Sequence, residues 1–216
     1  MELKKLIELQ NSLKERIVLE PFNKDFSLIL AVDSSYSKRL NKIISVALVY
    51  NKNEKRVVEK HYSLQEVNFP YIPGFLSFRE IDNTLIAVNK IKGNYDIVMV
   101  DGQGIAHPRN FGFASHLGVM INKPTIGCAK SRLVGEFREP ENFKGAFSYL
   151  YDNSKKIGAV LRTKKDIKPI FISPGHMIDI DSSVRIILQL TENYRLPEPI
   201  RSAHLFAEEV KRAWEN

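Results

Sequence analysis

The sequence predicts an α/β fold in which a mixed β-sheet is flanked by helices. Three apolar, β-prone segments joined by short polar loops follow an amphipathic N-terminal segment. Helical and strand-like segments then alternate between residues 75 and 129, which is typical of parallel α/β pairing. The chain has 216 residues without an internal repeat or a low-complexity tract, so a single domain over residues 1–216 is expected.

The first third of the chain reads as one helix and an antiparallel meander. Residues 2–19 carry apolar side chains at helical spacing, namely Leu3, Leu6, Ile7, Leu13 and Ile17. Residues 27–36, 43–50 and 56–64 are the three β-prone segments. Because polar turn segments of a few residues separate them, we expect consecutive strands to pair antiparallel.

The middle of the chain alternates between helix and strand. Residues 75–91 have helical apolar spacing and stop before Gly93. A short apolar run at 95–100 predicts a buried strand, 111–122 a short helix and 124–129 a further strand.

The last third predicts strands at 147–152, 157–163 and 169–173, followed by helices at 181–193 and 197–215. This order of elements describes a mixed sheet flanked by helices, as in a ribonuclease H-like fold.

The charge balance favours an anionic partner. The chain holds 32 Lys and Arg against 25 Asp and Glu, a net charge of +7. Nucleic acid fits this excess, although simple solubility would also account for it. The single cysteine, Cys128, excludes an internal disulfide framework and is expected to pack in the core. No run approaches the roughly 18 apolar residues of a membrane span, and the N-terminus does not resemble a signal peptide, so a cytoplasmic location is expected.

Three acidic residues lie where a charge is costly unless it is paired or holds a metal. Asp33 lies in the first predicted strand, Asp101 follows the strand at 95–100, and Glu80 lies near the start of the helix between them. If the first strand lies beside the fourth, both aspartates can face one crevice that Glu80 can reach. Clustered carboxylates favour Mg²⁺ or Mn²⁺, which promote phosphate hydrolysis. The alternative is three separate acids in solvated or salt-bridged positions.

The segment from residue 101 to 118 is the other dense region. Gly102 and Gly112 permit close backbone approach, but no GK[ST] follows, so this is not a P-loop. His107 and His116 are candidates for structural hydrogen bonding or for metal ligation. Arg109 fits a salt bridge or a phosphate contact equally well.

Six stretches together resemble the endonuclease V family: AVDSSY, PYIPGFLSFRE, VDGQGIAHPRNFGFASHLGV, PTIGCAKSRLVG, FISPGH and RLPEPIRSAH. They follow the family's order and cover most of residues 28–206. The resemblance implies a ribonuclease H-like fold and a metal-dependent DNA repair endonuclease. Such an enzyme recognises deoxyinosine, the product of adenine deamination, in double- or single-stranded DNA. It hydrolyses the second phosphodiester bond 3′ to the lesion, leaving a 3′-OH and a 5′-phosphate.

The resemblance also implies roles for individual residues. Asp33, Glu80 and Asp101 match the family's catalytic, metal-binding acids, with Mg²⁺ as cofactor and Mn²⁺ as substitute. Lys130 and His204 match further catalytic positions, Lys130 as a group that positions the nucleophile and scissile phosphate.

Tyr71, between two prolines that stiffen its loop, matches the wedge that separates the strands at the lesion. The remaining substrate-binding positions implied are Gly74, Leu76, Arg79, Gly102, His107 and Gly112. The sequence departs from the expected pattern at Ser34, Ser35 and Gln103.

Two other readings remain open at this level. An endoribonuclease that acts on inosine in RNA would use the same residues, because the contact to the 2′-OH depends on geometry. A non-catalytic nucleic-acid-binding module would not need all three acids and Lys130. A monomer is expected in either case.

Overall fold

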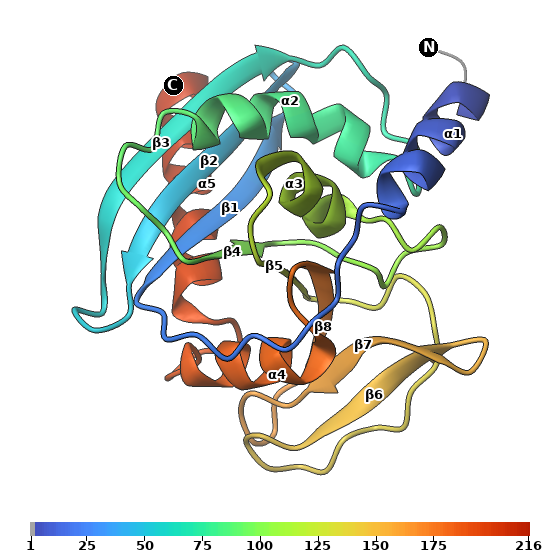
Figure 1. Ribbon diagram of the computed structural model, residues 1–216. Coiled ribbons are helices and arrows are strands. Elements are labelled where there is room, and N and C mark those ends of the chain that lie inside the picture. The colour runs from blue at the N-terminus through green and yellow to red at the C-terminus, as the bar shows by residue number, and fades with distance from the viewer. Residues whose placement is uncertain (1–2) are drawn as a thin grey trace.

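An eight-stranded mixed β-sheet organises the chain in this computed structural model, which describes residues 3–216. Its strands lie in the order β3-β2-β1-β4-β5-β8-β7-β6, and helices cover both faces (Figure 1). The strands are β1 Leu28–Ser37, β2 Lys42–Asn51, β3 Arg56–Glu66, β4 Ile97–Val100, β5 Thr125–Ala129, β6 Phe147–Asp152, β7 Lys155–Leu161 and β8 Ile170–His176. The helices are α1 Leu3–Lys14, α2 Leu76–Val88, α3 Phe113–Ile121, α4 Ile180–Gln189 and α5 Glu198–Glu215. The predicted fold class is confirmed.

The first strand lies in the middle of the sheet. β1, β2 and β3 form the predicted antiparallel meander, and β1 also pairs parallel with β4. β4 pairs parallel with β5, as the alternation of helix and strand predicted. The last three strands form a second antiparallel set, which joins the sheet through β5 and β8. The carboxyl ends of β1, β4 and β5 therefore meet at one edge of the sheet.

The two faces of the sheet carry separate apolar cores. Alternate residues of a strand point to opposite faces, and β1 follows this period of two. Ile29 and Ala31 pack in the core under α4 and α5, whereas Leu30 and Val32 pack in the core under α2 and α3. Alternate residues of β4 also point to opposite faces. The face toward which a side chain at the end of β1 or β4 points therefore follows from its position in the sequence.

Helix α1 is shorter than predicted and buries only part of the predicted apolar face. It ends at Lys14, not at residue 19, because the chain then runs along β8. The amide of Val18 donates to Nδ1 of His176 at 3.3 Å, and the carbonyl of Val18 accepts from the amide of Met177 at 2.7 Å. Leu6 and Gln10 are buried, whereas the predicted face residues Leu3 and Ile7 are exposed. These contacts to β8 outweigh the helical periodicity of the segment.

Helix α4 also differs in its bounds. It begins after Asp179, whose carboxylate accepts from the amide of Ser182, and it ends at Gln189, short of the predicted residue 193. Cys128 is fully buried as predicted, and this burial raises the pKa of its thiol. Within residues 3–216 no helix has the length and apolarity that crossing a membrane requires.

Candidate active site

Asp33 and Asp101 lie side by side because their strands are parallel neighbours. Val32 pairs with Val100 in the β1–β4 ladder, and the amide of Asp101 donates to the carbonyl of Val32 at 3.3 Å. Asp33 comes two residues after Ala31 and Asp101 two residues after Met99, so both continue the series that faces α5. The two aspartates are therefore neighbours at the end of the central strands, as the sequence predicted.

Two basic side chains complete this group. His204 of α5 contacts Asp33, with 3.0 Å between Nδ1 and Oδ2. Lys130, which directly follows β5, donates from Nζ to Oδ2 of Asp101 at 2.8 Å. Lys130 lies two residues after the core residue Cys128, so the same period of two directs it to this face.

The group has the donor chemistry of a divalent cation site. Asp33, Asp101 and His204 each offer one ligand atom, and these atoms lie within 4.8 Å of one another. Carboxylate oxygens are the ligands that Mg²⁺ and Mn²⁺ prefer, and imidazole is compatible with Mn²⁺. Asp33 is buried, and its burial together with the charge of Asp101 raises its pKa from 3.8 to about 6. A cation would relieve this repulsion, so the residues present fit the metal that the donor set implies.

Glu80 approaches the same group from the other side of β1. Burial of its carboxylate, followed by the charge of Asp33, raises the pKa of Glu80 from 4.5 to about 7. Asp101 contributes in the same direction, which places the three acids in one electrostatic group. Glu80 nevertheless lies outside the compact set formed by the two aspartates and His204. The structure thus brings Asp33, Asp101, His204 and Lys130 into direct contact and leaves Glu80 at their margin.

Lys130 is held in place by its acidic partner and by the loop that follows it. Partial burial lowers the pKa of Lys130, but the hydrogen bond to Asp101 and the charges of Asp101 and Asp33 together more than offset this, so the pKa is raised and the ammonium stays charged. The side-chain amide of Gln103 donates to the carbonyl of Ser131 at 3.0 Å. Gln103 therefore ties the loop after Asp101 to the residue next to Lys130, which gives this departure from the family pattern a structural role.

A second group of predicted residues surrounds the carbonyl of Gly74. Nε2 of His107 donates to this oxygen at 3.2 Å, while Nδ1 of His107 accepts from the amide of Arg109. The guanidinium of Arg109 and the amide of Gln10 also donate to the Gly74 oxygen. Burial, followed by the charge of Arg109, lowers the pKa of His107 to about 4, so this histidine is a neutral anchor.

Gln10 is the residue of this second group that the sequence did not predict. Its side chain is fully buried and accepts from Nε of Arg109 while donating to the carbonyls of Gly74 and Phe111. A signal was present, because Gln10 lies four residues after Leu6 and therefore on the same face of α1. A polar residue at that position indicates a buried hydrogen-bonding partner.

The remaining predicted residues lie around this anchor. Tyr71 has 64% of its surface exposed, and Leu76 is also exposed, so the anchored loop presents both side chains to solvent. The guanidinium of Arg79 lies 4.7 Å from the centroid of the Tyr36 ring. Gly74 has a φ of +79° and Gly112 has backbone oxygens where a Cβ would stand, so both positions require glycine. Gly102 has room for a side chain.

Comparison with known proteins gives a consistent result. The family model described as Endonuclease V matches residues 11–205. The chain is 46% identical to Endonuclease V of Dictyoglomus turgidum over 94% of this chain and 89% of that protein. The crystal structure of Endonuclease V from Streptomyces avermitilis superposes with a TM-score of 0.93 at 32% identity, covering 99% of this chain and 94% of the other. Endonuclease V of Ciona intestinalis, in complex with a 24mer DNA containing an inosine followed by a ribo-adenosine, shares the fold with a TM-score of 0.83 at 24% identity and 98% coverage of both chains.

Proposed function

Because the chain belongs to the endonuclease V family of deoxyinosine-specific repair nucleases, we propose that it hydrolyses the second phosphodiester bond 3′ to deoxyinosine. The products are a 3′-OH and a 5′-phosphate. The observation that carries this proposal is the group formed by Asp33, Asp101 and His204, with Lys130 on its rim. With a divalent cation held by the two acids, this group would bind a scissile phosphate, and the fixed ammonium would assist its hydrolysis.

The proposed cofactor is Mg²⁺, with Mn²⁺ as a substitute. Asp33 and Asp101 would hold the ion, with Glu80 or His204 completing the set. When bound, it would polarise the phosphate and favour ionisation of the attacking water. Asp33 and Glu80 resist ionisation in its absence because each is desolvated near other acids. Their crowding is the feature that supports a cation at this position.

The side chains around the acids have separate tasks in this proposal. Lys130 places a positive charge next to the site, where it would stabilise the negative charge that develops on the phosphate. His204 fixes the orientation of the Asp33 carboxylate through its contact at Oδ2 and keeps about half of its own side chain open to solvent. That exposure leaves the imidazole accessible to the substrate.

Recognition of the lesion is assigned to the anchored loop. Tyr71 would enter the base stack, because the three donors on the Gly74 carbonyl hold its loop before substrate arrives. A preformed loop avoids part of the ordering cost of binding. Gly74, Leu76, Gly102 and Gly112 would surround the extruded base. Arg79 and His107, which hold this region together, are the remaining substrate-binding residues proposed.

We extend the proposal to the organisation of the protein. Residues 1–216 would act as one domain and as a monomer, since the proposed site draws on β1, β4, β5 and α5 of a single chain. We place the protein in the cytoplasm and propose an inosine-containing nucleic acid as its substrate.

A nicking assay tests the proposal. Labelled duplex DNA, single-stranded DNA and RNA, each with one inosine, are incubated with the protein in Mg²⁺ or in EDTA. We expect one nick in DNA at the stated bond, no product in EDTA and no product from Asp101→Ala. Asp25→Asn, which changes an exposed acid, serves as the matched control and should retain activity. Full activity of Asp101→Ala, or equal cleavage of DNA without inosine, would contradict the proposal. Faster cleavage of RNA than of DNA would favour the endoribonuclease alternative.

A further inference from the structure

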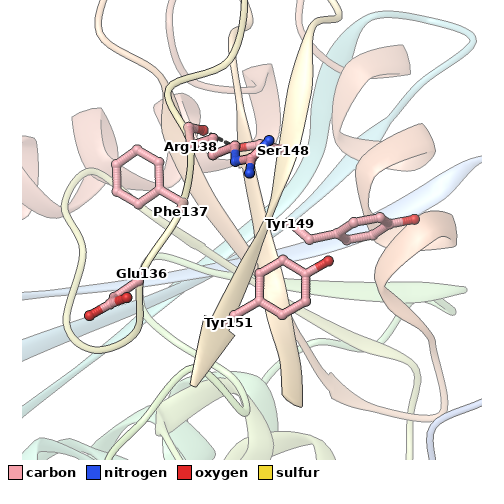
Figure 2. Close-up of a pocket in the computed structure, with 6 residues that line it drawn as sticks. All are labelled: Glu136, Phe137, Arg138, Ser148, Tyr149 and Tyr151. Carbon is pink, nitrogen blue, oxygen red and sulfur yellow. Dashed lines mark hydrogen bonds between the residues drawn. The ribbon is translucent and has the colours of Figure 1, made fainter. Parts of the chain in front are cut away.

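A pocket outside the acidic site lies at the far edge of the sheet. It has a volume of about 530 Å³ and lies between strand β6 and the segment that runs beside it. Figure 2 shows Tyr149 and Tyr151 on one side of β6 and Phe137 across from them on the neighbouring segment. The pocket is lined by Glu136, Phe137, Arg138, Ser148, Tyr149 and Tyr151.

The pocket opens because the neighbouring segment pairs with β6 only locally. Glu136 and Tyr151 exchange both backbone hydrogen bonds, at 2.7 and 2.9 Å. Further along, the hydroxyl of Ser148 donates to the carbonyl of Arg138 in place of a backbone partner. Two fixed points thus hold the segment beside the strand, and the space between them is preformed.

Strand β6 also carries a row of aromatic rings. Phe147, Tyr149 and Tyr151 occupy alternate positions, so all three side chains leave the same face of the strand. Neighbouring ring centroids lie 5.6 and 6.3 Å apart. Phe147 is 42% exposed and Tyr151 is 38% exposed, which is unusual for rings that could pack in a core. Rows of exposed aromatic side chains on a sheet are the platform on which single-stranded nucleic acids stack their bases.

Strand β6 lies in a basic part of the sequence. Residues 130–168 hold ten Lys and Arg against five Asp and Glu, a net charge of +5 out of +7 for the whole chain. Nζ of Lys156 lies 3.6 Å from the centroid of the Tyr149 ring, and Arg138 lines the pocket itself. Tyr149 is fixed from the other side, since its hydroxyl donates to Asp181 at 2.8 Å. The surface therefore combines stacking area with positive charge.

The sheet links this surface to the acidic site. The segment that borders the pocket begins at Lys130 and reaches Arg138 within eight residues. In the sheet, Ala129 is in register with Phe171, Phe171 with Val160, and Val160 with Ser148. Ala129 and Ser148 are therefore three strand spacings apart, which at about 4.8 Å each is roughly 14 Å. A strand spans this distance with about four nucleotides at a rise of about 3.4 Å each.

We propose that this surface binds unpaired nucleotides of a nucleic-acid strand whose scissile phosphate lies at the acidic site. We call it the β6 surface and define it by Arg138, Phe147, Tyr149, Tyr151 and Lys156. One base enters the pocket, where the aromatic rings supply stacking and Arg138 contacts the adjacent phosphate. Neighbouring bases stack along the row toward Phe147. The inference rests on the proposed nuclease function, and it adds that an unpaired flank strengthens binding.

The test compares a short inosine-containing duplex with the same duplex carrying an oligothymidine tail at either end. Dissociation constants are measured in Ca²⁺, which permits binding with little cleavage. We expect one of the two tails to tighten binding by about fivefold or more, the value for one stacked base. Tyr151→Ala and Phe147→Ala should each remove most of this gain, and Tyr151→Phe, which keeps the ring, should retain it.

A matched control comes from the opposite edge of the sheet. Tyr62 of β3 is 37% exposed, almost the same as Tyr151, so Tyr62→Ala removes an equivalent ring and should leave the gain intact. Arg138→Ala tests the phosphate contact without altering a ring. It should reduce the salt dependence of tail binding by a slope of about 0.7.

The outcomes separate this inference from the proposed function. If the duplex is nicked at inosine but neither tail strengthens binding, the β6 surface is not a nucleic-acid site while the nuclease assignment stands. If binding of oligothymidine depends on Tyr151 but inosine is not nicked, the proposed function fails and the surface remains. A concentration-dependent dimer that Tyr151→Ala abolishes, with no effect of a tail, would assign the surface to a second copy of the chain.

Discussion

The crowding of acids at the candidate site makes a quantitative prediction about stability. Burial and the neighbouring charge of Asp101 raise the pKa of Asp33 from 3.8 to about 6, net of its hydrogen bonds to His204 and Ser34. At 1.36 kcal/mol per pH unit, ionised Asp33 lowers the free energy of unfolding by about 3 kcal/mol. Asp33→Asn should therefore stabilise the metal-free protein while abolishing nicking. For a chain of this length, 1 kcal/mol corresponds to about 2–4 °C, so the melting temperature should rise by roughly 6–12 °C.

The pH dependence of this gain follows from the direction of the pKa change. A carboxyl group whose pKa is higher in the folded state than in the unfolded state costs stability once both states are ionised. Below pH 3.8 Asp33 is protonated in both states, so the substitution should have little effect there. The gain should appear between pH 3.8 and 6 and be complete above pH 6. Asp25→Asn, at an exposed acid, should change stability little at any pH.

Thermal melts of both variants and the wild type, in EDTA at several pH values, measure the effect directly. Added Mg²⁺ should then raise the melting temperature of the wild type more than that of Asp33→Asn, because a ligand stabilises only the state that binds it. A melting temperature for Asp33→Asn at or below the wild-type value above pH 6 in EDTA would refute the reasoning. So would a gain of equal size below pH 3.8.

Three further predictions concern Lys130, the loop of Tyr71 and the buried His116. Lys130→Ala should slow single-turnover nicking by about tenfold or more, which corresponds to about 1.4 kcal/mol of lost transition-state stabilisation. The dissociation constant in Ca²⁺ should stay nearly unchanged. An unchanged rate with weaker binding would indicate that Lys130 only attracts the substrate. Tyr71→Ala should weaken binding of duplex DNA more than of single-stranded DNA, by about 1–3 kcal/mol, and Gln10→Leu should give a smaller loss in the same direction. Equal losses on both substrates would remove Tyr71 as a wedge. Burial lowers the pKa of His116 from 6.5 to about 4, so stability should fall by roughly 3 kcal/mol as pH drops through this range. Urea unfolding of His116→Gln should show a weaker pH dependence than the wild type, and an unchanged dependence would show that burial of His116 is not the cause.

The sheet could be predicted from the sequence because each strand is a short apolar run between polar turns. Each of the eight predicted strand segments overlaps a strand of the structure. Asp33 and Asp101 could be predicted as neighbours because each follows the apolar run of such a strand. Adjacent parallel strands end at the same edge of the sheet. Once the register is known, the period of two also directs both side chains toward α5.

The contacts between distant segments could not be predicted in this way. His204 meets Asp33 across 171 positions of the chain, and Lys130 meets Asp101 across 29. Both contacts depend on how α5 and β5 pack, which no local pattern records. The resemblance to the family supplied His204 and Lys130, whereas Gln10 lay outside its motifs. The length of α1 was wrong because hydrogen bonds to β8, far along the chain, decide where that helix ends.

The acidic residues and the loop of Tyr71 are held by different parts of the structure, so substitutions should affect them separately. Asp33, Asp101 and Lys130 extend from three adjacent strands of the central sheet. The loop of Tyr71 is held by Gln10 of α1 and by the loop between β4 and α3, through the carbonyl of Gly74. Changes in α1 should therefore alter recognition of the lesion while leaving the rate of the chemical step intact. Changes in the packing of α5 should do the opposite, because His204 is its contribution to the acids. Substitutions should therefore be able to change the affinity for the lesion and the rate of the chemical step separately, although both groups of residues would contact the same bound strand.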